Sequence, residues 1–255
     1  MRIYHFKHKD KILYGILKED ILYPLKGSIF RKFRLGEEGI PLGEVILLPP
    51  VAPSKIIAVG ANYRNHAREM GHRIPEEPLI FLKPPSAVVG PNDVIIYPRM
   101  SKRVDYEGEL AFIIRKKAHF LNEEEGVDDY ILGYTCFNDV TARDLQEKDV
   151  QFTRAKSFDT FAAVGPCITT DVDPSQLRLK TFVNGKLRQS ASTRNFIFSV
   201  PFLLRFISQI MTLFPGDIIT TGTPAGVGPL KPGDRVDVQI EGIGTLSNTV
   251  MKIKR

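Results

Sequence analysis

Short apolar runs separated by turn-forming residues make up most of the hydrophobic pattern of this chain. Near the N-terminus, Met1–Phe6, Lys11–Leu17 and Ile21–Leu25 each have the length and composition of a β-strand. A proline-dense segment over residues 47–53 follows them, and such a segment is extended and typical of a linker. The pattern therefore predicts a small β-rich N-terminal domain with its linker over residues 1–50, and a larger domain over residues 51–255.

The larger domain repeats the pattern of short strands. The predicted strands are Lys55–Val59, Leu79–Leu82, Val104–Ile114, Tyr130–Phe137, Ala162–Ile168, Leu177–Val183, Asp217–Thr220 and Arg235–Ile240. The dipeptide Asn184-Gly185 directly after the sixth of these strands indicates a β-hairpin. Strand–helix–strand units are few, so the fold class is predicted to be mostly β with some α, and a doubly wound parallel sheet is disfavoured.

Three helices are predicted in the larger domain. The clearest is amphipathic and runs from about Pro201 to Leu213, with Ser199 as its N-cap. A second, short helix covers Tyr63 to Met70. A third begins at Thr141, where Asp144 three residues later forms a pattern like a capping box.

Carboxylates stand inside the strand Val104–Ile114, where a protein rarely places them. Strand side chains alternate between faces, so Asp105, Glu107 and Glu109 share one face, and the second half of the strand is apolar on both faces. Glu107 and Glu109 would lie roughly 7 Å apart, with a mutual repulsion of roughly 2 kcal/mol at an effective dielectric constant of about 20. A divalent cation would neutralise them; the alternative is a strand end that frays into water.

Composition and charge restrict the function classes. The chain has 255 residues, of which 43% are apolar and 25% charged, and no apolar run approaches the roughly 20 residues that span a bilayer. The N-terminus lacks the pattern of a signal peptide, so a cytoplasmic location without membrane contact is expected. Cys136 and Cys167 are expected to be buried free thiols. A net charge of +6 favours anionic small molecules, and the interleaved acidic residues argue against nucleic acid.

Two segments offer further acid–base groups. His66 and Glu69 lie three residues apart, on one face if that segment is helical, and a carboxylate that orients a histidine makes it a better base; the alternative is a polar surface helix. Asp139 ends an apolar run and either precedes a helix or adds a third carboxylate to the Glu107 and Glu109 pair, as a hard cation prefers.

The remaining candidates are residues that suit an anionic ligand. Arg143 and Gln146 lie three apart on the helix predicted after Asp139, and they either hold a carboxylate or are surface residues. Lys156 precedes an apolar strand and is either solvated or functional. The Gly/Thr loop over residues 220–228, with Thr223 at its centre, either binds an anion or is a tight connection that needs glycine.

Taken together, the segments resemble the fumarylacetoacetate hydrolase family, especially its acylpyruvase, oxaloacetate decarboxylase and 2-hydroxyhepta-2,4-diene-1,7-dioate isomerase members. The matching stretches are VGANYRNHAREM, PLIFLKPPSAVVGP, DYEGELAFII, YTCFNDVTARDLQ, RAKSFDTFAAVGP, VNGKLRQ and FPGDIITTGTPAGVGP, which occur in the family order over most of residues 55–230. The first 50 or so residues resemble the small N-terminal domain of many members.

The resemblance implies a mixed β-sandwich roll, a homodimer, and one Mg²⁺, Mn²⁺ or Ca²⁺ per subunit. It assigns the metal ligands to Glu107, Glu109 and Asp139, and the water-activating pair to His66 and Glu69. It further assigns Arg143, Gln146, Lys156, Thr223 and Lys83 to the substrate pocket, with Lys156 also a catalytic candidate.

The function expected from these assignments is Mg²⁺-dependent hydrolysis of a C–C bond in a β-diketo acid such as an acylpyruvate, through a pyruvate enolate. Decarboxylation of oxaloacetate or isomerisation of a hydroxy-dienoate would use the same enolate-stabilising site. An alternative of another class is a non-catalytic binder of anionic metabolites, which the pair of His66 and Glu69 disfavours.

Overall fold

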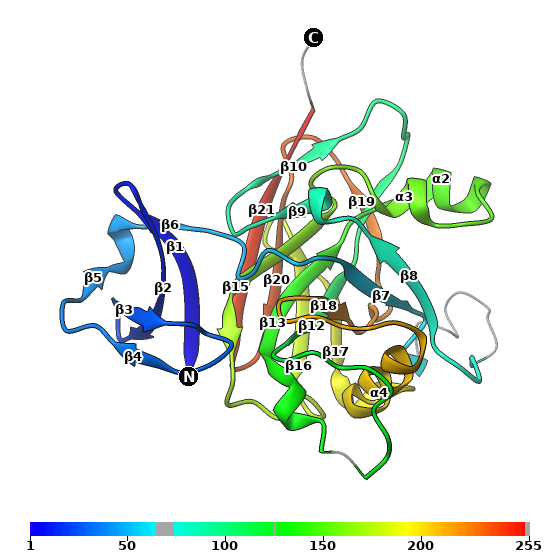
Figure 1. Cartoon of the computed structure of the whole chain (residues 1–255). Coiled ribbons are helices and arrows are strands. Elements are labelled where there is room, and N and C mark those ends of the chain that lie inside the picture. Colours follow the sequence, from blue (N-terminus) through cyan, green and yellow to red (C-terminus); the bar gives the residue numbers. More distant parts are fainter. Residues whose placement is uncertain (65–73, 125, 253–255) are drawn as a thin grey trace.

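The chain folds into a large β-structure that carries an N-terminal unit on one side, at the left of Figure 1. The structure is a computed structural model that describes residues 1–64, 74–124 and 126–252. The N-terminal unit consists of β1 (Arg2–His8), β2 (Lys11–Lys18), β3 (Ile21–Gly27), β4 (Phe33–Leu35), β5 (Ile40–Pro41) and β6 (Ile46–Leu47). The three longer strands predicted there are confirmed.

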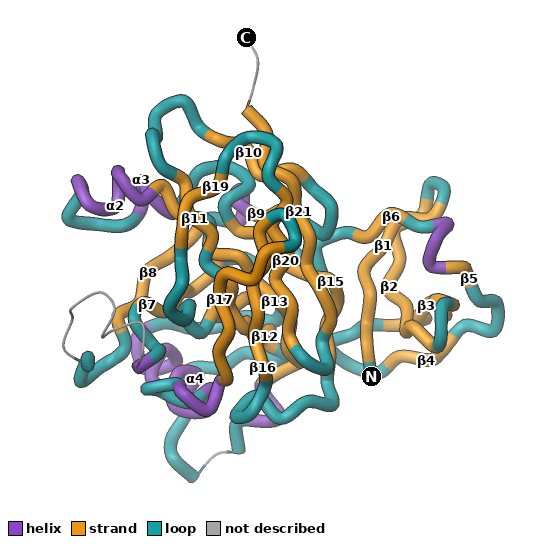
Figure 2. The backbone as a smooth tube through the Cα atoms, turned by 180° about the vertical axis from the view of Figure 1, so that it is seen from behind, coloured by secondary structure: helices purple, strands orange, loops and turns teal. Residues whose placement is uncertain are grey.

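The main body contains three sheets that are linked by short connections (Figure 2). The largest sheet has 13 strands, because β1 of the N-terminal unit pairs with β15. Its strands in the main body are β7 (Ile56–Gly60), β8 (Leu79–Lys83), β9 (Val88–Val89), β12 (Gly108–Ile114), β13 (Ile131–Asp139), β15 (Ala162–Thr169) and β18 (Ile218–Thr220). A five-stranded sheet is formed by β10 (Val94–Tyr97), β16 (Arg178–Val183), β17 (Lys186–Ser192), β20 (Arg235–Ile240) and β21 (Gly244–Lys252). The smallest contains β11 (Val104–Tyr106), β14 (Thr141–Ala142) and β19 (Gly228–Leu230).

Helices are few in the part of the chain that the structure describes, as the mostly β fold class predicts. They are α2 (Arg143–Lys148), α3 (Thr153–Lys156) and α4 (Val200–Ile210), with short 3₁₀ turns at Leu42–Glu44, Pro85–Ala87, Asp128–Tyr130 and Thr193–Asn195. Ser199 caps α4 by accepting a hydrogen bond from the backbone N of Phe202, as predicted. The helix ends at Ile210, earlier than expected, because Met211 is extended and Leu213 pairs with Ala118 as an isolated bridge. None of the described helices has the length and apolar character of a membrane span.

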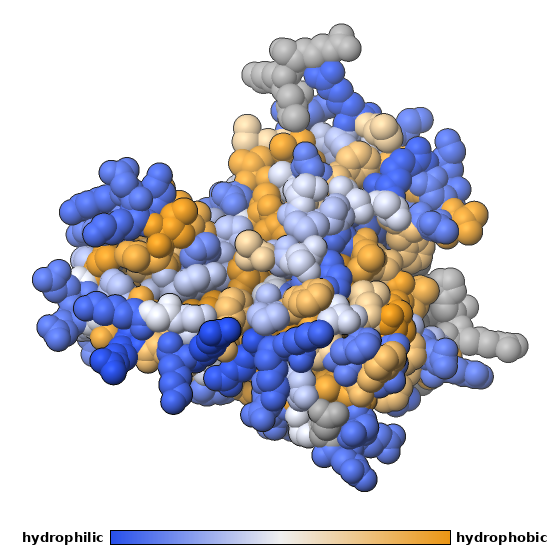
Figure 3. All heavy atoms as spheres, in the orientation of Figure 1, coloured by the Kyte–Doolittle hydropathy of each residue, from blue (hydrophilic) through white to orange (hydrophobic). Residues whose placement is uncertain are grey.

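The core lies between the two larger sheets and under α4. On β12, Leu110, Phe112 and Ile114 join a cluster that includes residues of β16, β20, β21 and α4, whereas Ala111 and Ile113 join a second cluster on the opposite face. This alternation is the one predicted for the second half of the acidic strand. On the outside of α4, Phe202 and Ile210 are exposed, and hydrophobic residues gather over this helix at the lower right of Figure 3.

Two local predictions are wrong, and a third falls outside the residues that the structure describes. The segment Val104–Ile114 is not one strand: it breaks at Glu107, and β11 and β12 belong to different sheets. Thr141 does not begin a helix, because it pairs in β14 and its hydroxyl donates to the carbonyl of Asp139; α2 begins at Arg143 without a side-chain cap. The helix predicted over Tyr63 to Met70 falls almost entirely outside the described residues.

The glycine that follows the break at Glu107 has no room for a side chain. A Cβ atom added to Gly108 would lie 2.1 Å from Oγ1 of Thr181 on β16. Thr181 is fully buried, and its branched side chain is stiff at χ1. We expect Gly108→Ala to lower the free energy of unfolding by about 1–3 kcal/mol, as overpacked core substitutions do. Chemical denaturation would measure this loss. Gly43→Ala is the matched control, since an added Cβ meets no atom within 4 Å there; an equal loss in both variants would contradict the steric explanation.

Candidate active site

Three buried carboxylates converge where β12 and β13 lie side by side. Glu107 precedes β12, Glu109 is its second residue, and Asp139 is the last residue of β13. The antiparallel register pairs Gly108 with Asn138, and the backbone N of Asp139 donates to the carbonyl of Glu107 at 2.9 Å. One oxygen from each of the three carboxylates lies within 4.8 Å of the others, and the residues are only 6%, 1% and 1% exposed.

Two buried lysines hold Asp139 from opposite sides. Lys156, the last residue of α3, places its Nζ 2.6 Å from Oδ2 of Asp139 and 2.8 Å from Oε2 of Glu107. Lys83, at the end of β8, donates to Oδ1 of Asp139 and at 3.4 Å to the carbonyl of Val140. The carboxylate of Asp139 is therefore fixed in one orientation by two charge-assisted hydrogen bonds.

The guanidinium group of Arg143 is largely committed to protein acceptors. Its Nε donates to Asp105 at 2.9 Å, and its two terminal nitrogens contact Glu107 and Gln146. Asp105 is fully buried and also binds Arg103 through two hydrogen bonds of 2.9 and 3.1 Å. Because arginine has five N–H groups, at most two of those of Arg143 are left for a ligand.

Charge and burial act differently on these groups. Burial opposes ionisation of Glu107, but the positive charges of Lys156 and Arg143 outweigh it and lower its pKa to about 2. Burial also acts to lower the pKa of Lys156, yet Asp139 and Glu107 raise it overall. For Lys83, burial dominates and lowers the pKa. For Glu109, burial and the charges of Asp139 and Glu107 together raise the pKa well above its usual value.

The chemistry of the donor set fits a hard divalent cation. It offers only carboxylate oxygens, which Mg²⁺, Mn²⁺ and Ca²⁺ prefer over nitrogen and sulfur donors. Glu109 accepts a hydrogen bond from the backbone N of Gly222 at 2.9 Å, but within the described residues it forms no ion pair. A cation held by the three carboxylates would supply the positive charge that Glu109 lacks.

A pocket of about 270 Å³ opens onto this cluster. The predicted site residues that line it are Glu107, Glu109, Asp139, Arg143, Gln146, Lys156 and Thr223. Its remaining wall is mainly apolar and includes Val59, Leu79, Phe81 and Phe152, with the last two rings edge to face at 5.5 Å. Lys83 was expected in the pocket, but it lies behind Asp139 and does not line it. His66 and Glu69 lie outside the described residues.

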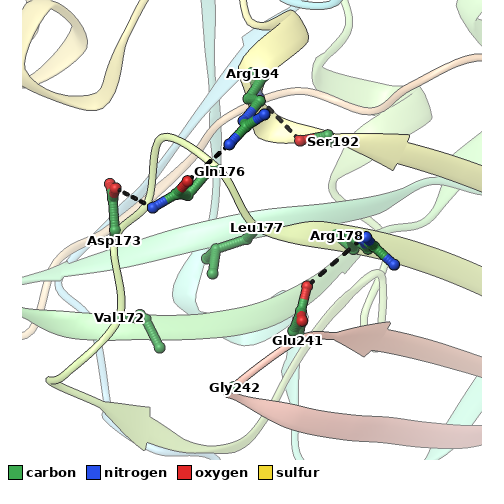
Figure 4. Close-up of a pocket in the computed structure, with 9 residues that line it drawn as sticks. All are labelled: Val172, Asp173, Gln176, Leu177, Arg178, Ser192, Arg194, Glu241 and Gly242. Carbon is green, nitrogen blue, oxygen red and sulfur yellow. Dashed lines mark hydrogen bonds and ion pairs between the residues drawn. The ribbon is translucent and has the colours of Figure 1, made fainter.

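A larger hollow of about 560 Å³ exists away from the carboxylates (Figure 4). Its charged groups already have partners in the protein: Arg178 faces Glu241 at 3.9 Å, and Arg194 donates a hydrogen bond to the neutral amide of Gln176 at 2.9 Å. Arg178 and Glu241 are also well exposed, so water already solvates them. The 270 Å³ pocket, with its buried ionic groups, is the better candidate for chemistry.

Two residues with well-defined positions were given no role by the sequence. Asp105 was placed on the acidic face, but its function of orienting Arg143 depends on a contact 38 residues away along the chain. Gln189 on β17 is 1% exposed and bonds to Gly108, Thr223 and Pro224. The motif VNGKLRQ, which ends at Gln189, was the one available signal for it.

Comparison with known proteins shows the family of the chain. The sequence model described as fumarylacetoacetate (FAA) hydrolase C-terminal matches residues 55–251, and one described as Rv2993c-like, N-terminal, matches residues 1–50. Oxaloacetate tautomerase YisK of Bacillus subtilis is 45% identical over 231 residues, which cover 85% of this chain and 76% of the relative.

Two solved structures share the fold along the whole chain. 2-Hydroxyhepta-2,4-diene-1,7-dioate isomerase from Mycobacterium marinum superposes with a TM-score of 0.93 at 42% identity, covering 100% of both chains. Maleylpyruvate hydrolase from Sphingobium sp. SYK-6 gives a TM-score of 0.82 at 34% identity, covering 99% of this chain and 100% of the other. The chain therefore belongs to the fumarylacetoacetate hydrolase family.

Proposed function

We propose that this protein is a divalent-cation-dependent enzyme that enolises a 2-oxo acid, and that it interconverts the keto and enol forms of a 2-oxo dicarboxylate such as oxaloacetate. The observation that carries the proposal is the cluster of three carboxylates with oxygens within 4.8 Å of one another, next to the buried ammonium group of Lys156. The choice of tautomerisation is supported by the relative of 45% identity that is named for it.

The residues of the pocket have distinct tasks in this reaction. Glu107, Glu109 and Asp139 would hold the cation, which when bound supplies positive charge that polarises the 2-oxo group and stabilises an enolate. Lys156 keeps its proton because of Glu107 and Asp139, and its ammonium group stabilises negative charge that develops on a substrate oxygen. The apolar wall keeps bulk water away, which strengthens these interactions. His66 remains the predicted base, with Glu69 as the carboxylate predicted from the sequence to orient it.

Hydrolysis of a C–C bond in an acylpyruvate, the reaction expected from the sequence, is the second candidate. It is supported by the similarity to maleylpyruvate hydrolase, and it needs the same enolate together with a water molecule activated by His66. A homodimer is likewise expected from the family resemblance and stays a prediction.

Removal of the cation is expected to stop the reaction. Enol loss from oxaloacetate would be followed by ultraviolet absorbance after treatment with a chelator and again after Mg²⁺ is restored. Because such a cation contributes several kcal/mol to stabilising the developing charge, we expect chelation to slow turnover about 100-fold or more. Solutions with the same Mg²⁺ and no protein provide the control, and chelator-insensitive turnover would contradict the proposal.

The same preparations separate the two candidate reactions. Pyruvate release from acylpyruvates reports hydrolysis, and CO₂ release from oxaloacetate reports decarboxylation. If acylpyruvate cleavage is much faster than enol loss, and if His66→Ala abolishes it, hydrolysis replaces tautomerisation as the principal activity.

A further inference from the structure

Gln189 is the one fully buried residue of β17, a strand that otherwise faces solvent or is half-buried. Its amide oxygen accepts from the backbone N of Gly108 at 3.0 Å. Its amide nitrogen donates to Oγ1 of Thr223 and to the carbonyl of Pro224, both at 2.8 Å. A backbone N–H can only donate and a carbonyl can only accept, so these partners fix the orientation of the amide.

The orientation of the Gln189 amide determines in turn whether the hydroxyl of Thr223 donates or accepts toward each of its partners. That hydroxyl accepts from Gln189 and lies 3.0 Å from the carbonyl of Gly108, which can only accept. The single hydroxyl hydrogen of Thr223 must therefore point to Gly108. Thr223 lines the pocket, and its hydroxyl has no proton left to donate to a ligand there.

Both peptide groups of Gly108 are consequently fixed by side chains, one from β17 of the five-stranded sheet and one from the loop between β18 and β19. Its N–H is bound by Gln189, and its C=O is bound by Thr223. Gly108 separates Glu107 from Glu109, so these two bonds set the relative orientation of two of the three carboxylates. Partners of this kind, one step removed from a cation, commonly change affinity by about 10–100-fold when they are lost.

We propose that Gln189 is a positioning residue for the cation site: it fixes the backbone between Glu107 and Glu109, and it leaves the Thr223 hydroxyl able only to accept a hydrogen bond from a ligand in the pocket. This inference rests on the proposed function for the identity of the cation site. It also specifies that the ligand group facing the Thr223 hydroxyl is a donor, such as an enol hydroxyl or a water molecule.

Mn²⁺ binding to the free protein tests the proposal without turnover. Calorimetry and the electron paramagnetic resonance signal of free Mn²⁺ would measure the dissociation constant of wild type, Gln189→Met and Thr223→Val. Gln239→Met on β20 of the same sheet is the matched control, because Gln239 is exposed and lies outside the pocket. Thermal unfolding checks that each variant is folded.

We expect Gln189→Met and Thr223→Val each to weaken Mn²⁺ binding about 10–100-fold, with Gln239→Met equal to wild type. The double variant should bind no more weakly than the worse single variant, because the two residues act in one chain of hydrogen bonds. Enolisation by Gln189→Met should recover at correspondingly higher Mn²⁺, which a general loss of stability would not produce. If Gln189→Met does not fold, Thr223→Val carries the same prediction.

The outcomes separate this inference from the proposed function. Wild-type Mn²⁺ affinity in folded Gln189→Met, or in folded Thr223→Val, overturns the inference and leaves the proposed function intact. If wild type binds Mn²⁺ but converts none of the 2-oxo acids, the proposed function fails, while the affinities still decide the role of Gln189. Absence of Mn²⁺ binding in wild type overturns both.

Discussion

Asp139→Asn is expected to abolish activity and to destabilise the protein at the same time. The substitution removes one of the three carboxylates of the cation site and leaves Lys83, which is 1% exposed, beside a neutral amide. Breaking a buried ion pair by removing one partner costs about 3–5 kcal/mol. We expect a loss of that size in the free energy of unfolding, measured by chemical denaturation, and a fall in turnover of about 1,000-fold or more.

A second substitution distinguishes the two effects of Asp139→Asn. In the double variant Lys83→Met, Asp139→Asn, no buried charge is left without its partner at Lys83, so most of the lost stability should return while activity stays absent. Asp149→Asn is the matched control: its ion pair with Arg154 is exposed, so stability and turnover should hardly change. Normal turnover in Asp139→Asn, measured with Mg²⁺ present, would remove Asp139 from the site.

The sequence was a good guide to those parts of the fold that depend on local pattern. Alternation along Gly108–Ile114 predicted which residues face each core cluster, and Asn184-Gly185 predicted the hairpin of β16 and β17. These features depend on neighbours within a few residues. The same holds for the N-cap at Ser199.

The break at Glu107 could not be predicted, because it is caused by tertiary contacts. Val104–Tyr106 pairs with β14 and β19, whereas Gly108–Ile114 pairs with β13 and β18. Directly after the break, Gly108 meets Thr181 and Gln189 of the five-stranded sheet. The pattern of residues 104–114 does not indicate that the five-stranded sheet packs against Gly108.

The position of Gln189 was hidden by an irregularity of register. In a regular two-residue hairpin with Val183 opposite Lys186, the residue opposite Thr181 would be Arg188. The register shifts between Thr181 and Phe182, so Gln189 takes that place instead. A shift by one residue exchanges the exposed and buried faces of a strand, and the sequence alone does not reveal it.

The candidate site was predicted as a set of residues rather than as a network. Seven of the residues named from the sequence line one pocket, since the register of β12 and β13 brings Asp139 next to Glu107. The sequence did not show which of these residues contact one another. Lys83 supports Asp139 from behind, and Asp105 holds Arg143, because each contact joins residues more than 35 positions apart.

Lys156→Met is expected to separate cation binding from catalysis. Lys156 neutralises Glu107 and Asp139, so its removal leaves the two carboxylates more available to a cation; we expect Mn²⁺ affinity to rise about tenfold or more. Turnover should nevertheless fall about 100–1,000-fold, as when one stabilising donor of a developing oxyanion is lost. Calorimetry and the enol assay would measure the two effects on the same preparation.

Lys156→Met and Gln189→Met are expected to change the affinity for Mn²⁺ in opposite directions, so the two variants can be told apart. Both variants should lose activity, but one binds the cation more tightly because a competing charge is gone, and the other binds it more weakly because the ligands are misaligned. Without cation, Lys156→Met should lose about 3–5 kcal/mol of unfolding free energy, since two buried carboxylates lose their shared partner. Saturating Mn²⁺ should restore much of that loss. Weaker Mn²⁺ binding in folded Lys156→Met would show that the ammonium group does not compete with a cation for these oxygens.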